Sequence, residues 1–359
     1  MEQASLRLMC GLMARGHRCR VLSLNPLGPL EDLLRENDIP ATGLPYEGHL
    51  GWKSAPRLFR HLRKEHADGV IMTGHNLLAM LALGGLGKDH RLLAMHFHHG
   101  VRKQWQWRIF YRLAQPRFNA ISFPSDFVRH EAEAIYPDIK SLARTIRNPL
   151  EPPLKQSASL KRAARARLGL PADVLIVGNA GWLIDRKRFD VFLQTASRVI
   201  AEERQVRFVI AGDGPMGEEL KALASNLGIA DSVIWIGWQK SMKDFYHAID
   251  LLLFNSDWDA MGNTPLEAMA HGIPVVASVL HGGLKEIISN RQFGYVIDRH
   301  DPEQLARAIE QVFHSDDLYE QGRRHVIALS DPEYIAGQVE HILRFGVEPV
   351  FLQTSFQSS

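Results

Sequence analysis

Short apolar runs recur along the chain, each followed by a polar or glycine-containing turn and then by an amphipathic stretch. In the first half these runs predict strands at 19–24, 69–74, 91–97 and 119–125, with helical stretches between them. Continuously apolar runs are typical of strands buried on both faces, and their alternation with helices favours a parallel, doubly wound sheet. The first half is therefore expected to form an α/β domain.

The same alternation restarts after a break. Residues 148–159, NPLEPPLKQSAS, are rich in proline and polar residues and carry no periodic pattern, which is typical of an interdomain linker. Apolar runs beyond it predict strands at 174–181, 207–214, 232–238, 250–256 and 274–278.

Two Rossmann-like domains, at 1–150 and 151–330, are therefore expected to face each other across a cleft lined by the C-terminal ends of their strands. The helix and tail at 331–359 are expected to pack back toward the first domain.

Composition agrees with two globular domains. A chain of 359 residues is too long for one ordinary core, and 45% hydrophobic with 23% charged residues is typical of a soluble protein. No apolar run in the sequence approaches the roughly 20 residues needed to span a bilayer. Cys10 and Cys19 are the only cysteines, too few for a disulfide framework, so a cytoplasmic protein is expected.

The net charge is +2, but it is unevenly spread. Residues 1–152 hold 21 Lys and Arg against 14 Asp and Glu, or +7, and the remainder holds 21 against 26, or −5. A basic first half could face an anionic acceptor or membrane headgroups, which would place the protein peripherally at the inner face of the membrane. Ordinary surface variation explains the asymmetry equally well. No nucleic-acid-binding module is apparent.

Residues 259–278, DAMGNTPLEAMAHGIPVVAS, carry the most specific pattern. Asp259 and Glu267 flank a Gly-Asn-Thr-Pro turn that opens a helix, and free amides at a helix start favour an anion. Thr264 to Glu267 has the form of a capping box with Pro265 at the first helical position. A cap accounts for Glu267 but not for Asp259. The two carboxylates could hold sugar hydroxyls while the amides hold a phosphate, and this combination predicts a sugar-nucleotide site.

A basic turn follows the first strand of the second domain. Arg186, Lys187 and Arg188 stand five to seven residues after Gly181, and three adjacent cations could neutralise a diphosphate. Taken alone, this segment is equally a solvated basic turn. The functional interpretation gains from the segment at 259–267, which is expected to open onto the same cleft.

The segment at 212–217, GDGPMG, matches the G-x-G-x-x-G pattern without predicting a dinucleotide site. Pro215 removes an amide donor, and the next strand ends in Gly-Trp instead of an acidic residue. It is interpreted as a tight strand-to-helix turn bordering the cleft.

Histidines cluster at the end of the strand at 91–97. His96, His98 and His99 lack the further ligands of a closed zinc site, so no metal is expected. His96 is singled out because it ends a strand that faces the expected cleft. The stretch at 105–113, WQWRIFYRL, is interpreted as a core-facing helix in preference to a membrane anchor.

Four elements in order make the chain resemble the family-four retaining glycosyltransferases of the GT-B fold. They are the basic glycine turn at 181–187, the Gly-Asp-Gly-Pro turn after RFVIA, SVIWIGW followed by DFYHAIDLLLFNS, and the two carboxylates with EAMAHGIPVVAS. The resemblance covers nearly the whole chain and is strongest at 174–297. It implies that the second domain holds a nucleotide sugar and that the first holds the acceptor.

The resemblance also implies roles for single residues. Glu267 would bind the ribose hydroxyls, Asp259 the transferred sugar and Lys187 the diphosphate, with His96 near the reacting sugar. The implied catalytic set is Asp259, His96 and Lys187, and the donor-binding set is Gly181, Arg186, Lys187, Gly212, Trp238, Asn263, Thr264 and Glu267. Three positions depart from the family, which usually has Arg at Trp182, Gly at Arg188 and Glu at Asp259.

The expected function is the transfer, with retention, of a sugar from a UDP- or GDP-linked donor to a sugar or lipid-linked acceptor in glycan or glycolipid synthesis. The resemblance implies no metal and no cofactor. Two alternatives stay open: a non-catalytic binding protein of the same fold, and a nucleotide-sugar epimerase.

The start of the chain departs from a doubly wound domain, which normally opens with a central strand and a Gly-rich turn. Here the helix at 4–15 comes first. We expect the first domain to lack its first strand, with roughly 10–20 further residues upstream in the native protein. The alternative is a variant whose sheet closes over the gap.

Overall fold

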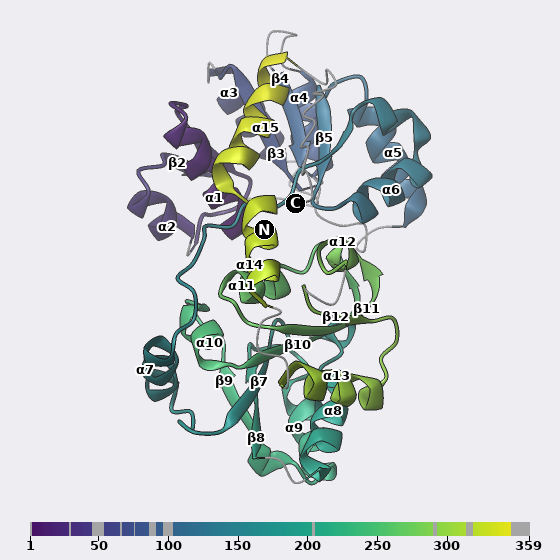
Figure 1. The fold of residues 1–359 in the computed structure, drawn as a ribbon. Coiled ribbons are helices and arrows are strands. Elements are labelled where there is room, and N and C mark those ends of the chain that lie inside the picture. The colour runs from purple at the N-terminus through teal and green to yellow at the C-terminus, as the bar shows by residue number, and fades with distance from the viewer. Residues whose placement is uncertain are drawn as a thin grey trace, which may run out of the picture. The chain divides into compact units, whose positions relative to one another are not determined.

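A computed structural model describes residues 2–28, 30–44, 54–64, 67–74, 76–85, 91–95, 103–202, 205–289, 293–313 and 319–345. The chain divides into two compact units. The first unit comprises Met1–Pro149 with Pro332–Ser359, and the second comprises Leu150–Asp331. Figure 1 shows their helices and strands.

The first unit alternates short strands with helices. Its elements are α1 (Glu2–Ala14), β1 (Val21–Ser23), α2 (Leu30–Glu36), β2 (Ala41–Gly43), α3 (Ala55–Lys64), β3 (Gly69–Thr73), α4 (Leu77–Gly84), β4 (Arg91–Met95), α5 (Gln104–Ala114), β5 (Ala120–Phe123), α6 (Asp126–Ile135), a 3-10 turn (Pro137–Ser141), β6 (Ala143–Thr145) and α15 (Pro332–Phe345).

All strand pairs of the first unit are parallel. Strands β3, β4, β5 and β6 form one sheet in sequence order, and β1 pairs with β2 in a separate two-stranded sheet. Every residue of β5 is buried, as its continuous apolar run predicts for a central strand.

Helix α15 belongs to the first unit although it follows the second in sequence. Figure 1 shows α1 beside α15. Leu8 and Leu12 of α1 share a buried cluster with Ile335 and Val339 of α15. Gly11 permits this close approach, because a Cβ there would lie 2.9 Å from the carbonyl oxygen of Pro332. The two ends of the described chain are thus joined by apolar packing.

The second unit has longer strands. Its elements are α7 (Ala158–Leu168), β7 (Leu175–Ala180), a 3-10 turn η3 (Asp185–Lys187), α8 (Phe189–Ala201), β8 (Val206–Ala211), α9 (Gly217–Asn226), a second 3-10 turn (Ala230–Ser232), β9 (Val233–Gly237), α10 (Lys243–Ala248), β10 (Leu251–Asp259), α11 (Asn263–Ala270), β11 (Val275–Gly282), α12 (Leu284–Ile287), β12 (Tyr295–Ile297), α13 (Pro302–Phe313) and α14 (Tyr319–Leu329).

These six strands form one parallel sheet in the order β12-β11-β10-β7-β8-β9. Numbered from β7, the sheet has the 3-2-1-4-5-6 strand order of dinucleotide-binding folds. In this order, strands 2 and 3 are added on one side of the first strand and strands 4 to 6 on the other, so the strand order reverses between the first and fourth strands. The reversal lies between β7 and β10. Ligands of such sheets bind at the carboxyl ends of the strands beside this reversal.

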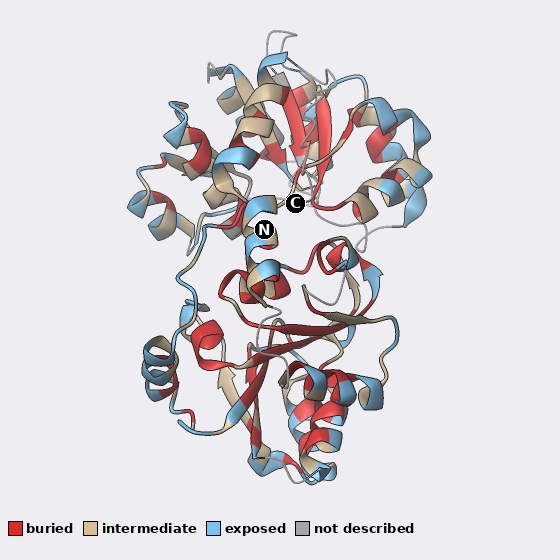
Figure 2. Cartoon of the chain, in the orientation of Figure 1, coloured by how far each residue is buried: buried red, intermediate tan, exposed pale blue. Residues whose placement is uncertain are grey.

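Side chains of this sheet alternate between two cores. Leu252 and Phe254 of β10 pack with α10, α11 and α14, whereas Leu251 and Leu253 pack with α8, α9 and α13. Successive strand residues point to opposite faces, so a strand apolar at every position is covered on both sides. Figure 2 shows these strands buried between helices whose outer surfaces are exposed.

The predicted fold class, α/β with two Rossmann-like domains, is confirmed by these parallel sheets and their alternating helices. The predicted strand boundaries are less accurate. β10 continues to Asp259 and β11 to Gly282, beyond the predicted ends at 256 and 278. The sequence also failed to predict β2, β6 and β12, because each has only three residues, too few to show a periodic pattern.

Candidate functional site

A cavity of about 550 Å³ lies at the carboxyl ends of β7, β8 and β9 in the second unit. It is lined by Ala180, Gly181, Trp182, Ala211, Gly212, Asp213, Gly214, Trp238, Gln239, Met242, Tyr246, Asn263, Thr264 and Glu267. Most of these residues stand at a strand end or in the turn after it. The fold therefore places the cavity where a doubly wound sheet binds its ligands.

Two glycine turns form one wall of the cavity. Gly212 has φ +134° and a Cβ there would overlap the carbonyl oxygen of Gly181. Gly214 is equally enclosed, since its Cβ would lie 2.5 Å from the carbonyl oxygen of Leu183. The segment joins β8 to α9 as a tight turn, as predicted. The absence of side chains therefore lets the two turns approach each other closely along this wall.

The turns after β8 and β9 are hydrogen-bonded to each other. The Gly212 amide donates to the Gly237 carbonyl over 2.8 Å, and the Trp238 amide donates to Oδ2 of Asp213 over 3.1 Å. Asp213 therefore fixes the backbone that carries Trp238. Trp182 and Trp238 are 64% and 69% exposed, so two accessible indole rings border the cavity.

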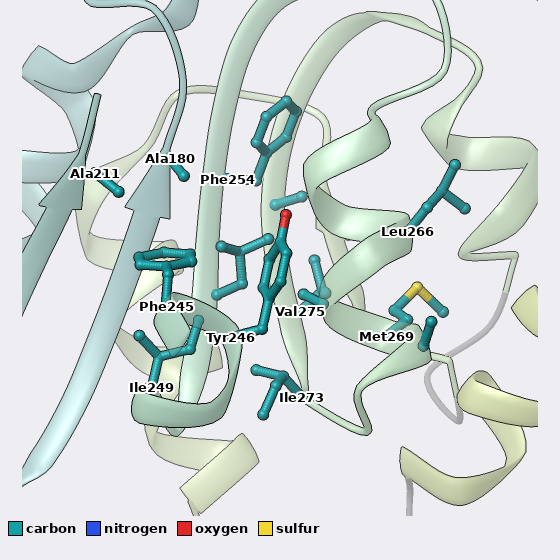
Figure 3. Packing of buried hydrophobic residues seen from close by; sticks show 14 of the residues in the cluster. Ala180, Ala211, Phe245, Tyr246, Ile249, Phe254, Leu266, Met269, Ile273 and Val275 are labelled. Atoms are coloured by element: carbon teal, nitrogen blue, oxygen red, sulfur yellow. The ribbon is translucent and has the colours of Figure 1, made fainter. Parts of the chain in front are cut away.

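Glu267 lies on α11, and Tyr246 lies on α10. The Tyr246 hydroxyl donates to Oε2 of Glu267 over 2.9 Å, and the Tyr246 ring packs 4.9 Å from the ring of His271. Figure 3 shows Tyr246 among the core side chains with its hydroxyl pointing away from Ile273. The ring is buried while its hydroxyl holds one carboxylate oxygen in place.

The buried ring of His271 has an altered protonation equilibrium. Burial lowers the pKa of His271 from 6.5 to about 4, although its hydrogen bond to the Glu267 carbonyl acts in the opposite direction. Nearby His247 and Arg323 also disfavour the charged imidazole. His271 is therefore neutral at pH 7 and behaves as part of the packing behind Glu267.

The predicted capping box at the start of α11 is wrong. The cap position is Gly262, with φ +78°, and no side chain caps the helix there. The side chain of Asp259 instead accepts from the Gly262 amide over 2.8 Å, and the Thr264 hydroxyl donates to the Ala180 carbonyl over 3.5 Å. A left-handed glycine lets β10 turn directly into α11, so the helix starts before Thr264.

Lys187 and Asp259 form an ion pair, with 2.5 Å between Nζ and Oδ2. Their side chains are 18% and 14% exposed, and Nζ also lies 5.0 Å from the centre of the Phe254 ring. Burial by itself raises the pKa of Asp259, but the charge and hydrogen bond of Lys187, the Gly262 amide and the charge of Arg186 together lower it. Asp259 is therefore ionised at neutral pH.

The flanking arginines have other partners. Arg186 donates to the carbonyl of Trp258 and lies 5.9 Å from the centre of its ring. Arg188 occupies a left-handed conformation with φ +45°. The family that the sequence resembles usually has glycine at this position.

Arg188 points its guanidinium at two carboxylates, Asp190 at 2.9 Å and Asp257 at 3.1 Å. The hydrogen bond that Arg188 donates to Asp190 is the largest influence on the pKa of Arg188 and raises it; burial opposes this rise, and Asp257 reinforces it. The cavity lining, as far as the structure describes it, includes none of the three cations of the basic turn.

A hydrogen-bonded chain runs behind β10 and β11. His300 bridges Oγ of Ser278 at 2.7 Å and Oδ1 of Asp257 at 2.9 Å, and Asn255 donates to the same Ser278 oxygen. The residue types are those of a serine hydrolase triad. However, Ser278 is fully buried and cannot reach a substrate, so this chain of contacts is structural.

The cavity brings together six predicted donor-binding residues: Gly181, Gly212, Trp238, Asn263, Thr264 and Glu267. Lys187, Arg186 and Asp259 lie outside its lining, beside the turn that starts α11. His96, like His98 and His99, lies outside the described residues. Their roles toward a ligand stay predictions.

Sequence reasoning missed Tyr246 and Asp213 as site residues. Tyr246 lies within the quoted segment DFYHAIDLLLFNS, but no pattern indicates that its hydroxyl meets a carboxylate 21 residues later. Asp213 lies inside the turn that was predicted to border the cleft. Its position after a buried strand was a usable signal.

Two further searches cover only the residues that the structure describes. Within the described ranges, no group of three or more His, Cys, Asp or Glu side chains could hold a metal ion. Of the helices described, none is both long and apolar enough to cross a bilayer.

Two family models match the chain. Residues 1–152 match "Glycosyltransferase Family 4", and residues 160–325 match "Glycosyl transferases group 1".

Two curated proteins match part of the chain. The lipopolysaccharide core biosynthesis glycosyltransferase LpsE of Rhizobium meliloti is 33% identical over 154 residues, 43% of this chain and 44% of LpsE. A D-inositol 3-phosphate glycosyltransferase of Thermobispora bispora is 36% identical over 197 residues, 52% of this chain and 43% of that protein. The chain thus spans less than half the length of these relatives.

A solved structure matches nearly the whole chain. HepE (Alr3699) of Anabaena, in complex with UDP and glucose, superposes with a TM-score of 0.79 over 95% of both chains, at 18% sequence identity. A similarity at this identity establishes a common two-domain fold.

Proposed function

The chain belongs to glycosyltransferase family 4, and from this premise we propose that it is a retaining transferase of the hexosyltransferase type. It takes a sugar from a UDP- or GDP-linked donor and passes it to a sugar or lipid-linked acceptor in glycan or glycolipid synthesis. The observation that carries the proposal is the cavity where Glu267, held by Tyr246, meets two glycine turns and the start of α11.

The cavity offers a suitable group for each part of a nucleoside diphosphate. A carboxylate makes charge-assisted hydrogen bonds to ribose hydroxyls, which suits Glu267. The amides of Asn263 and Thr264 at the helix start suit phosphate oxygens, and Gly181 leaves room for them because it has no side chain. Trp238 offers an indole face for the base. The HepE complex with UDP supports a nucleotide donor.

The proposed reaction is a front-face substitution at the anomeric carbon. The acceptor oxygen forms its bond to this carbon on the face from which the diphosphate leaves. The carbon–oxygen bond to the diphosphate breaks, its electron pair stays on the phosphate oxygen, and the acceptor proton passes to that oxygen. Lys187, a neighbouring arginine and the start of α11 stabilise the growing charge, which is the largest kind of catalytic term. Asp259 and His96 are assigned to the transferred sugar.

Helix α5 of the first unit supports an acceptor at a membrane surface. Trp107, Phe110, Tyr111 and Ala114 are buried. The opposite face is exposed and carries Trp105 and Ile109 beside Arg108 and Arg112. The helix therefore has an outer apolar and basic face besides the core-facing one that the sequence predicted. Such a face suits anionic lipid headgroups, so the proposed location is the inner face of the cytoplasmic membrane.

The experiment is a calorimetric titration with UDP and GDP, followed by incubation with donor sugars. We expect micromolar binding of one nucleoside diphosphate and slow donor hydrolysis. In the presence of an acceptor, the product keeps the anomeric configuration of the donor, as read by NMR. Binding without any turnover would favour a non-catalytic protein, and an isomerised donor without acceptor would favour an epimerase.

A further inference from the structure

Lys187 has two partners within the protein itself. Its ammonium group is 2.5 Å from Oδ2 of Asp259 and 5.0 Å from the centre of the Phe254 ring. Both side chains of the pair are largely buried, so their charges neutralise each other away from bulk water. A diphosphate that is to be met by Lys187 must therefore compete with Asp259.

The two members of the pair differ in mobility. Asp259 ends β10, and its other oxygen, Oδ1, accepts from the Gly262 amide over 2.8 Å. The carboxylate is thus anchored by a short side chain and a second hydrogen bond. Lys187 ends the turn η3 on a four-carbon stem and can redirect its ammonium group without moving the backbone.

The position of the pair connects it to the cavity. Asp259 precedes Asn263 and Thr264 by one turn of chain, and both of these residues line the cavity. Lys187 lies five residues after Trp182, another lining residue. The ion pair is therefore joined by short chain segments to residues that line the cavity, among them the start of α11, where phosphate oxygens are proposed to bind.

We propose that Lys187 exchanges partners during the catalytic cycle: it pairs with Asp259 in the empty site and with the diphosphate in the donor complex. Asp259 acts as a positioning residue that takes Lys187 back when the nucleoside diphosphate leaves. The exchange rests on the proposed function, because it needs a nucleoside diphosphate at this site.

The exchange has a consequence with a definite sign. When a diphosphate binds, the contact between Lys187 and Asp259 is lost. The Asp259 carboxylate, which the Gly262 amide holds in place, then has no cationic partner. Asp259 therefore weakens nucleoside diphosphate binding and speeds its release. A residue that merely supported the fold would do the opposite, since its loss would weaken binding.

Asp259→Asn tests the exchange with UDP as the probe, or with GDP if wild-type protein prefers it. Asparagine keeps an oxygen for the Gly262 amide but cannot form the ion pair. We expect the dissociation constant for UDP to fall about fivefold or more, since Lys187 no longer has to leave a charged partner in order to meet the diphosphate. UDP should become a correspondingly stronger product inhibitor.

Asp257→Asn is the matched control. Asp257 lies on the same strand and pairs with Arg188 and His300 instead of Lys187. Its substitution removes the same charge, and we expect the UDP dissociation constant to stay within about twofold of wild type, because the charge lost is not the partner of Lys187. An equal gain in both variants would mean a general charge effect and would overturn the exchange.

A Lys187→Met background completes the test. Without the ammonium group, adding Asp259→Asn should change UDP affinity less than about twofold, because the pair no longer exists. An undiminished gain there, or an unchanged or weaker UDP affinity in Asp259→Asn itself, overturns the exchange. If the Asn variant fails to fold, Asp259→Ser removes the pair and takes its place. Wild-type protein that binds neither UDP nor GDP overturns the proposed function instead.

Discussion

The hydroxyl of Tyr246 lies 2.9 Å from Oε2 of Glu267 and donates a hydrogen bond to it. The two residues come from consecutive helices, and the buried Tyr246 ring fixes the direction from which the hydroxyl arrives. This contact orients the carboxylate to which we assign the ribose. The function of Tyr246 should therefore be measurable as ligand affinity.

Tyr246→Phe should weaken UDP binding by about tenfold, because a hydrogen bond to a charged group contributes about 1.5–3 kcal/mol. The loss should shrink for 2′-deoxy-UDP, which lacks a ribose hydroxyl. Tyr319→Phe is the control, since its hydroxyl bonds the Val312 carbonyl outside the cavity lining. Equal losses for UDP and 2′-deoxy-UDP would show that Tyr246 does not act through the ribose.

Gly212→Ala should destabilise the second unit strongly. The added Cβ would overlap the Gly181 carbonyl oxygen, so the two glycine turns would have to separate. We expect a loss of about 3 kcal/mol or more in the free energy of unfolding, the range of overpacking plus backbone strain. Gly228→Ala also has positive φ but no neighbour within 4 Å, so it should lose only about 1 kcal/mol. Chemical denaturation of both variants is the measurement, and similar losses would contradict the close approach.

His271 should make stability depend on pH below neutrality. Its folded pKa of about 4 lies below 6.5, so the unfolded state binds the proton first as pH falls. Its contribution is complete above pH 6.5 and is lost progressively down to about pH 4, at most about 3 kcal/mol. Unfolding free energies of wild type and His271→Gln, compared at several pH values, should show a shallower fall in the variant. Parallel curves would mean that His271 is protonated in the folded protein.

Trp105→Ser with Ile109→Ser should reduce binding to vesicles that contain phosphatidylglycerol by about tenfold or more, since burying two large apolar side chains contributes several kcal/mol. Pure phosphatidylcholine vesicles should bind both proteins weakly. Leu154→Ser removes another exposed apolar side chain and should change nothing. Unaltered vesicle binding by the double variant would exclude the outer face of α5.

The apolar runs predicted the strands of the second unit because each is buried on both faces, which needs no polar alternation. They could not give the ends of β10 and β11, where Asp259 and Gly282 continue the pairing despite losing apolar character. They also could not give three-residue strands such as β12. The apolar pattern of a segment indicates whether that strand is buried. The ends of β10 and β11 and the short strand β12 depend instead on pairing with a neighbouring strand.

The candidate site was predictable where one residue's chemistry suffices. Gly212 follows a buried strand, and Glu267 follows a turn that opens a helix. The contact of Tyr246 with Glu267 and the pair of Lys187 with Asp259 join residues 21 and 72 positions apart. Such contacts follow from the packing of whole elements. From the sequence, Lys187 was therefore predicted to be a cation that meets only the diphosphate, although in the fold it pairs with Asp259.

The central claim is that the cavity of the second unit binds a nucleoside diphosphate through Glu267. Glu267→Gln keeps the size of the side chain and removes its charge, so it tests this claim most directly by calorimetric titration with UDP and GDP. We predict that wild type binds one of them and that the variant, still folded by thermal unfolding, binds it about tenfold or more weakly. Equal affinity in the two proteins would contradict the account.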